Sequence, residues 1–451
     1  MSLASERALR VDEGGRSPGA ALALGVLLAV PLAVSLVLYW PVIAIDGGWL
    51  FVADSQRYLR HPSGTFHPSE LMRFTGLHFV PLPRLIYATM QALFDTWWTP
   101  WGIAAVTLHA LLVAAVGVVI HRYSRSLLAA LLVMVPLVTS WALSSGVLTN
   151  FAHACLALLM TMLVLTPVLA DQFVLHPSGR SAATLFVASL VAIFMSIPGA
   201  LFYAGALVFY VGLKYARGIG TPWRAGLWRL DRQDAVIVSV MAVSALIYSV
   251  TYWIALNMNG WRFPTQINLC TDTSGFTLTD RTLQVLAFAY AGLFATPYEY
   301  AALGAPTSLW RTAAGVATVA LLGASAYALV SRRPVLVRHR PVTVVVAGCL
   351  VMALLGTAML VMGRSCIGLW HMRYIGYPLL FLAAMSGTLL GVALRALPVQ
   401  IRPYLAALLL VGMAWLTTQN VQAVLASTFM TGRTPGAYAS QTLDRDLELE
   451  P

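Results

Sequence analysis

Charged residues are scarce in this chain of 451 residues. Asp, Glu, Lys and Arg make up 10% of it, against about 25% in soluble domains. Lysine occurs once, and no hydrophilic stretch is long enough to form a separate soluble domain. Hydrophobic residues reach 59%, and the mean hydropathy is +0.78. These values exclude an ordinary soluble enzyme and predict a polytopic membrane protein.

Several functional signatures are also absent. The sequence has no Walker loop, no GxSxG and no HExxH. Ionisable residues are nearly missing from the apolar stretches, which argues against an ion pump or a proton-coupled transporter. The net charge is +11, but there is no basic soluble face to bind nucleic acid. We therefore assign the basic residues to loops that face an anionic membrane leaflet. The strong preference for arginine indicates a GC-rich bacterial genome. We expect a multi-pass protein of the plasma (inner) membrane that belongs to the cell envelope.

Uncharged stretches of about 20 residues predict the membrane spans. The first follows a short polar N-terminus and reads as a retained signal anchor. We expect an all-α bundle of about eleven spans, one polytopic domain over 1–430, and a loose, acidic tail over 431–451. The predicted spans are 20–44, 101–120, 127–143, 150–170, 182–197, 199–213, 235–256, 308–330, 342–363, 375–394 and 403–424.

The distribution of basic residues predicts the orientation. Seventeen of the 28 basic residues fall in the loops that this arrangement places on one side, and basic loops mark the cytoplasmic side. The N-terminus is therefore predicted to be cytoplasmic and the C-terminus extracytoplasmic. The cytoplasmic segments are 1–19, 121–126, 171–181, 214–234, 331–341 and 395–402; the outer polar segments are 46–100, 257–307 and 364–374.

Three segments are harder to place. Counting Phe79–Phe94 as a span would put basic loops outside, so we expect an amphipathic helix along the outer membrane surface. Counting Thr282–Tyr298 as a span would likewise put a basic loop outside, so we expect this segment also to lie along the outer membrane surface. Ser181–Leu213 is short for two spans, and it is either a tight hairpin or a re-entrant pair.

The first outer segment, 46–100, holds the candidate catalytic acids. Asp46 stands at the membrane boundary and Asp54 lies eight residues further on. A carboxylate beside lipid can have a raised pKa and act as a general base. The structural alternative for Asp54 is a helix cap, because Asp-Ser can cap a helix that begins at Gln56.

Histidines in the same segment offer further contacts. His78 is the first residue of the tract "HFVPLPRL". It is either a substrate contact or an interfacial side chain beside an aromatic belt. His61 and His67, with Asp54 and Glu70, form a possible ligand set for a divalent metal, although their spacing matches no zinc signature.

The last outer segment contains "GRSCIGLWHMRYIGYP". Arg364 and Arg373 lie in this outer segment, whereas most other basic residues are predicted to be cytoplasmic. Arginine binds phosphate in a bidentate manner, so a phosphate site is one interpretation and an interfacial anchor is the other. The candidate substrate-binding residues are Arg364, His371, Arg373 and Tyr374.

Four cysteines occur. Cys155 and Cys349 fall inside predicted spans and are expected to be apolar packing residues. Cys270 and Cys366 fall in outer segments, where an oxidising compartment permits a disulfide between them. The sequence alone does not show that they are close.

With the motifs "DSQRYL", "LHFVPLPRLIYATMQALF" and "GRSCIGLWHMRYIGYPLLFL", the chain resembles the GT-C superfamily of glycosyltransferases. These polytopic enzymes, among them the aminoarabinose and protein O-mannosyl transferases, use polyprenyl-phosphate-linked sugars. Asp54, Tyr58 and Pro81 stand where the family pattern has an acid, a tyrosine and a proline before an amphipathic helix. Ser55 replaces the second acid of many members, which leaves Asp46 as a rival base.

The resemblance implies an inverting sugar transfer on the extracytoplasmic side. Asp54 would act as the base, and Arg364 and Arg373 would stabilise the lipid phosphate that leaves. The implied partners are a polyprenyl-phosphate sugar, membrane lipid, and a lipid, glycan or protein acceptor. A non-catalytic transporter or flippase of lipid-linked glycans is the alternative, and a membrane partner in an envelope complex is a third possibility.

Overall fold

The computed structural model describes residues 18–44, 68–75, 78–94, 97–140, 143–144, 148, 151–219, 231–260, 278–294, 308–331, 333, 336–337, 339–363 and 372–426. This part of the chain is helical except for one pair of two-residue strands. Its longer helices are α2 (Pro18–Leu38), α6 (Trp98–Ser124), α7 (Leu127–Thr139), α9 (Phe151–Leu175), α10 (Gly179–Met195), α11 (Ala200–Ala216), α12 (Arg232–Met258), α13 (Leu278–Phe294), α15 (Ser308–Val330), α17 (Arg340–Gly363), α18 (Met372–Ala396) and α19 (Arg402–Ala426).

These helices confirm a multi-pass membrane architecture. Within the described residues, nine helices are long and apolar enough to cross a bilayer, and α7 and α10 are shorter apolar helices. Each of the eleven predicted spans coincides with one of these helices. The count of eleven crossings remains a prediction, because α7 and α10 fall short of the usual spanning length.

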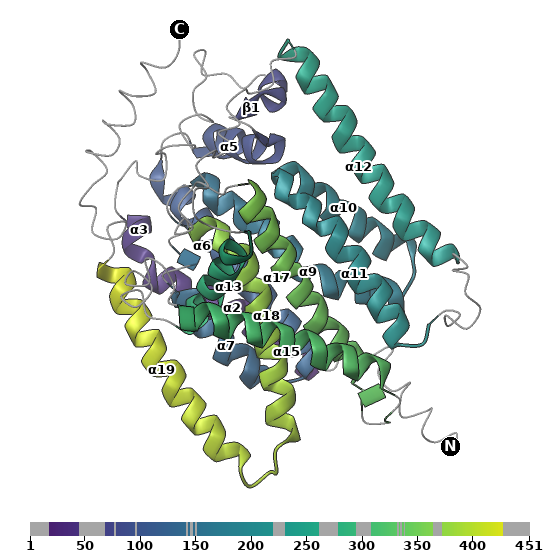
Figure 1. Cartoon of the computed structure of the whole chain (residues 1–451). Coiled ribbons are helices and arrows are strands. Elements are labelled where there is room, and N and C mark those ends of the chain that lie inside the picture. Colours follow the sequence, from purple (N-terminus) through teal and green to yellow (C-terminus); the bar gives the residue numbers. More distant parts are fainter. Residues whose placement is uncertain are drawn as a thin grey trace.

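The helices form one bundle (Figure 1) and share one large apolar core. α6, α9, α17 and α18 are the most buried of the long helices, and α12, α15 and α19 lie at the periphery. The peripheral helices expose large apolar side chains such as Trp253 and Trp415, as expected where a helix faces lipid.

One end of the bundle, which we call the basic end, is tied together by ion pairs. Asp171 near the end of α9 accepts hydrogen bonds from Arg122 of α6 and from Arg217 just after α11, with N–O distances of 2.8 and 2.6 Å. The Asp171 side chain is only 2% exposed. Because one buried carboxylate needs both cations, the C-terminal ends of three helices are fixed together.

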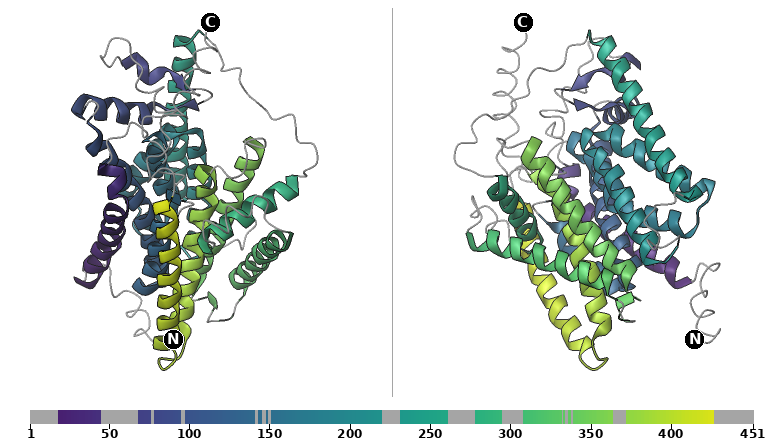
Figure 2. Two further views of the ribbon diagram at one scale, coloured as in Figure 1. Left: turned by 90° about the vertical axis from the view of Figure 1, so that its left-hand side faces the viewer. Right: turned by 45° about the vertical axis from the view of Figure 1, so that its right-hand side comes forward.

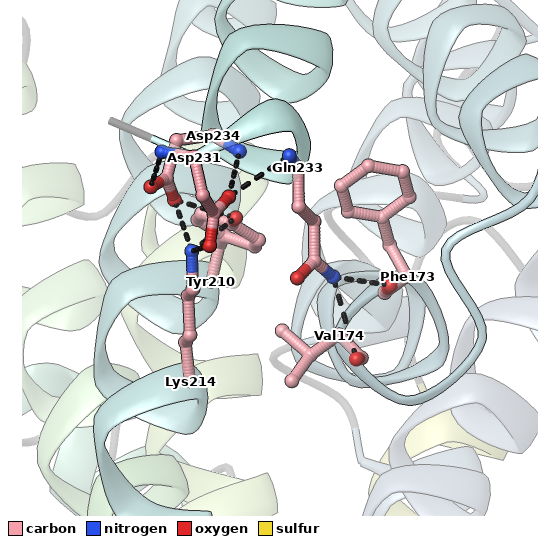
Figure 3. A network of polar contacts seen from close by, with 7 residues as sticks. All are labelled: Phe173, Val174, Tyr210, Lys214, Asp231, Gln233 and Asp234. Carbon is pink, nitrogen blue, oxygen red and sulfur yellow. Dashed lines mark hydrogen bonds and ion pairs between the residues drawn. The ribbon is translucent and has the colours of Figure 1, made fainter. Parts of the chain in front are cut away.

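A second network at the basic end fixes the start of α12 (Figure 3). The Lys214 ammonium contacts Asp231 at 2.7 Å and Asp234 at 2.6 Å, and the Tyr210 hydroxyl donates to Asp234 at 2.7 Å. Asp231 also caps α12 by accepting backbone N–H groups of that helix, in a reciprocal capping box with Asp234. Gln233 donates its amide N–H to the Phe173 carbonyl at 2.8 Å, which joins α12 to α9.

The basic end collects the loops that the sequence places on the cytoplasmic side. Besides these networks, Arg395 at the end of α18 donates to the Ser124 carbonyl at the end of α6, at 3.1 Å. At the other end, which we call the platform end, Asn259 after α12 donates to the Met72 carbonyl at 2.9 Å. The predicted grouping of these loops therefore agrees with the arrangement of the helices.

The platform end carries a small layer across the bundle, residues 68–75 and 78–94, which we call the platform (Figures 1 and 2). It consists of the 3-10 helix η2 (Pro68–Met72), strands β1 (Phe74–Thr75) and β2 (His78–Phe79), and α5 (Pro81–Phe94). Helix α5 corresponds to the predicted amphipathic segment. It is amphipathic and lies across the bundle end, with Pro81, Pro83, Arg84 and Tyr87 buried. The short helix α3 (Trp40–Ala44) follows α2 and packs against α6.

The segment Ser181–Leu213 forms a hairpin. α10 runs from the basic end to contacts with α5, and α11 returns to Arg217. The 3-10 turn η3 (Ile197–Gly199) joins them, and a Cβ on Gly199 would lie 2.0 Å from the Ala192 carbonyl oxygen. Only glycine allows the two helices to turn this tightly.

Helix α13 contains residues 282–294 of the segment predicted to lie along the membrane surface. It packs against α15, α17 and α18. Val285 contacts Leu360 and Val361, and Gln284 is 8% exposed. Its apolar face is therefore covered by protein, which the sequence could not distinguish from a face covered by lipid.

We predict that Asp171→Asn destabilises the protein. Losing one partner of a buried ion pair typically costs about 3–5 kcal/mol, and we expect roughly 1–3 kcal/mol here because the two arginines are partly exposed. Thermal unfolding in detergent measures the change. Asp231→Asn is the matched control with a smaller expected loss, since its side chain is 46% exposed. Equal melting temperatures for Asp171→Asn and the wild type would contradict the structural role.

The orientation is tested by cysteine labelling in intact cells, in a background lacking the native cysteines. Ser331→Cys lies at the basic end and should resist a membrane-impermeant thiol reagent, whereas Ser69→Cys on the platform should react. Ser69 is exposed, so its reactivity reports the side of the membrane. Ready labelling of Ser331→Cys, with Ser69→Cys protected, would invert the predicted orientation.

Candidate functional site

Most residues singled out from the sequence lie outside the described residues: Asp46, Asp54, Tyr58, His61, His67, Cys270, Arg364, Cys366 and His371. For His78, Arg373, Tyr374 and Glu70 the structure describes the backbone. His78 belongs to β2 and Glu70 to η2, while Arg373 and Tyr374 belong to the first turn of α18. The disulfide between Cys270 and Cys366 remains a prediction. Cys155 and Cys349 are buried free thiols, as expected.

The two predicted site regions lie at the same end of the bundle. The platform contains His78, and α18 begins at Met372 opposite its basic-end terminus at Arg395. Gly376 in the next turn of α18 lies close to Met160 of α9, whose own N-terminal turn contacts α5 through Phe151. The fold thus brings the beginning of α18 and the platform to one face of the protein.

The platform is built on a β-hairpin with aromatic contacts. Phe74 pairs with Phe79, and Thr75 pairs with His78, in antiparallel register. The Phe79 ring is fully buried and lies 5.8 Å from Tyr252 of α12, and Phe74 meets Tyr252 edge-on at 5.4 Å. These contacts hold the hairpin against α12, and the backbone of His78 with it.

An aromatic trio attaches α5 to the bundle. Tyr87 of α5 lies 5.5 Å from Trp101 of α6 and 5.1 Å from Phe151 of α9, and Trp101 and Phe151 lie 4.7 Å apart. All three rings are at most 1% exposed. Because rings of this size bury much apolar area, we expect the trio to help anchor α5 to α6 and α9.

Arg84 is a buried cation of the platform to which the sequence assigned no role. It lies in the second half of the first turn of α5 and is 8% exposed. One Nη donates to the Phe74 carbonyl at 3.3 Å, so the guanidinium also braces the hairpin. Arginine is rarely buried without partners. The sequence does distinguish Arg84, because it is the one Lys or Arg in the apolar tract 79–94.

His109 was also missed. It lies in the middle of α6, is fully buried, and stacks edge-on against Tyr39 at 5.5 Å. Its Nδ1 is 3.5 Å from the Ser35 hydroxyl, and its Nε2 has no hydrogen-bond partner. An ionisable residue at this depth is uncommon. Its described contacts, Ser35 and Tyr39, are uncharged, so packing is the role that the geometry supports.

Metal ligands do not gather within the described part of the chain: no three His, Cys, Asp or Glu side chains there are placed to hold an ion. The candidate ligands His61, His67, Asp54 and Glu70 have side chains outside this description, so the predicted metal site stays open.

Comparison with known proteins adds no assignment. No protein-family model, no curated protein and no solved structure matches the chain.

The anchoring role of the aromatic trio gives a testable prediction. Trp101→Ala should cost about 3–5 kcal/mol, the usual loss for a fully buried tryptophan, and should speed amide hydrogen exchange in α5 more than in α9. Trp253→Ala is the matched control, because that side chain is 57% exposed on α12. Unchanged exchange in α5 of Trp101→Ala would show that other contacts hold the platform.

Proposed function

We propose that the protein is a membrane glycosyltransferase of the GT-C type, which moves a sugar from a polyprenyl-phosphate donor to an acceptor on the extracytoplasmic side. The observation that supports it best is the platform. A proline-led amphipathic helix, with a buried arginine in its first turn, lies across the same bundle end as the start of α18. In the sequence, the first outer segment contains the platform and the last one contains the start of α18. These segments carry the candidate acid and the candidate phosphate ligands.

The proposed reaction is a single displacement. Asp54 takes the proton of the acceptor hydroxyl, and the hydroxyl oxygen attacks the anomeric carbon. The new C–O bond forms as the bond from that carbon to the phosphate oxygen breaks, which inverts the configuration. The polyprenyl phosphate leaves with the electron pair, and Arg364 and Arg373 stabilise its added charge.

Other residues have supporting roles in this proposal. The candidate contacts for the sugar or the phosphate are four residues of the outer segments: Tyr58, His78, His371 and Tyr374. Arg84 joins them as a buried cation at the same bundle end. A divalent metal, if bound, would add positive charge beside the phosphate. The sugar and the acceptor are not specified by these residues.

Asp54→Asn tests the base. The amide keeps the shape of the side chain and loses its charge and basicity, so sugar transfer should fall roughly 100- to 10,000-fold while expression and donor binding are nearly unchanged. Release of polyprenyl phosphate from a panel of polyprenyl-phosphate sugars by purified protein gives the rate. Arg373→Lys should weaken donor use, because lysine keeps the charge but loses the bidentate contact.

Asp46→Asn is the matched control, as the second acid of the same segment. If Asp46→Asn is inactive and Asp54→Asn turns over donor at the wild-type rate, the base is Asp46. If both variants remain fully active, the glycosyltransferase proposal fails and a non-catalytic carrier of lipid-linked glycans is favoured.

A further inference from the structure

An apolar groove opens on the side of the bundle between α7, α18 and α19. Its volume is about 540 Å³, within the range of small-molecule sites. Helix α19 packs against α7 and is otherwise largely exposed, which leaves the groove accessible from the side. Its lining includes Leu132 and Pro136 of α7, Leu390 of α18, and Leu408, Gly412 and Trp415 of α19.

Gly412 leaves space in the groove. A Cβ at this position would meet no atom within 4 Å. The lining is almost wholly hydrocarbon, so water gains few hydrogen bonds there. In a membrane, a groove of this composition suits a hydrocarbon chain.

The same three helices bring exposed arginines together at the basic end. Arg125 stands in the turn before α7, Arg395 in the last turn of α18, and Arg402 at the start of α19. They are close to one another, because Arg395 donates to the Ser124 carbonyl at 3.1 Å and Arg402 donates to the Arg395 carbonyl at 2.7 Å. These bonds go to carbonyl oxygens, so the positive charges are not neutralised by them.

The acids described at this end are occupied elsewhere. Asp171 pairs with Arg122 and Arg217, and Asp231 and Asp234 pair with Lys214. Within the described residues, the arginine cluster of Arg125, Arg395 and Arg402 therefore has no carboxylate partner and presents its charge to the membrane boundary. Three such arginines attract an anion.

The spacing between the cluster and the groove fits a phospholipid. Leu390, Leu132 and Leu408 lie five to seven residues along their helices from the three arginines, which corresponds to roughly 8–10 Å. The polar headgroup region of a bilayer is about 5–8 Å thick on each side of the hydrocarbon core. A phosphate at the arginines would therefore place the attached acyl chain in the part of the groove nearest the basic end.

We propose that this surface binds one anionic phospholipid, with its phosphate on Arg125, Arg395 and Arg402 and one acyl chain in the groove between α7, α18 and α19. The site lies at the opposite end from the platform, so it does not depend on the proposed glycosyltransferase activity. It stabilises the position of α19, which otherwise has few contacts with α18.

Native mass spectrometry of the detergent-purified protein tests the proposal with phosphatidylglycerol and phosphatidylcholine of identical chains. The wild type should retain one phosphatidylglycerol in preference to phosphatidylcholine. Each arginine removed should weaken retention about five-fold. The double variant Arg125→Asn/Arg402→Gln should therefore lose about 30-fold for phosphatidylglycerol and little for phosphatidylcholine. Asparagine is chosen at position 125 because it tolerates the left-handed backbone there, where φ is 54°.

Two matched controls separate this site from a general effect of charge or bulk. Arg180→Gln removes an exposed arginine at the start of α10, also at the basic end, and should leave retention unchanged. Gly412→Phe should reduce retention of both lipids by filling the groove, whereas Gly323→Phe on α15, another glycine with open space around it, should not. Equal retention of the two lipids by the wild type, or an equal loss for Arg180→Gln and the double variant, would overturn the proposal.

Discussion

The buried Asp171 carboxylate sets the relative positions of three helix ends. It is shared by Arg122 and Arg217, and so it fixes the ends of α6, α9 and α11 at one level. The adjacent pairs of Lys214 with Asp231 and Asp234 then set where α12 begins. In a membrane the hydrophobic effect does not choose between neighbouring helices, so polar contacts at the helix ends and close packing between helices determine which helices are neighbours.

The opposite end is organised by aromatic packing. Tyr87, Trp101 and Phe151 hold α5 across the bundle, while Phe79 and Tyr252 hold the β-hairpin against α12. The ion pairs hold helix ends together at the basic end, and the platform end is where the proposed reaction would take place.

The sequence predicted the helices well, whereas the candidate site remains a prediction. Long uncharged runs have few structural alternatives in a bilayer, so each predicted span is found as a helix. For the segment that turns at Gly199, the sequence allowed either a tight hairpin or a re-entrant pair. The contact of α10 with α5 favours the hairpin, because it places the end of α10 at the platform. The burial of α13 could not be predicted, because an apolar face has the same composition whether lipid or protein covers it. Arg84 and His109 were missed because a single polar residue in an apolar run gives no indication of its partners.

In our proposal, the platform end carries out sugar transfer from a polyprenyl-phosphate donor. The most direct measurement is the anomeric configuration and yield of product when purified wild-type protein is incubated with a panel of polyprenyl-phosphate sugars and a membrane extract as acceptor. The proposal predicts consumption of one donor, release of polyprenyl phosphate in equal amount, and a product of inverted configuration. Full recovery of every donor, with translocation of one of them across a vesicle membrane, would contradict it.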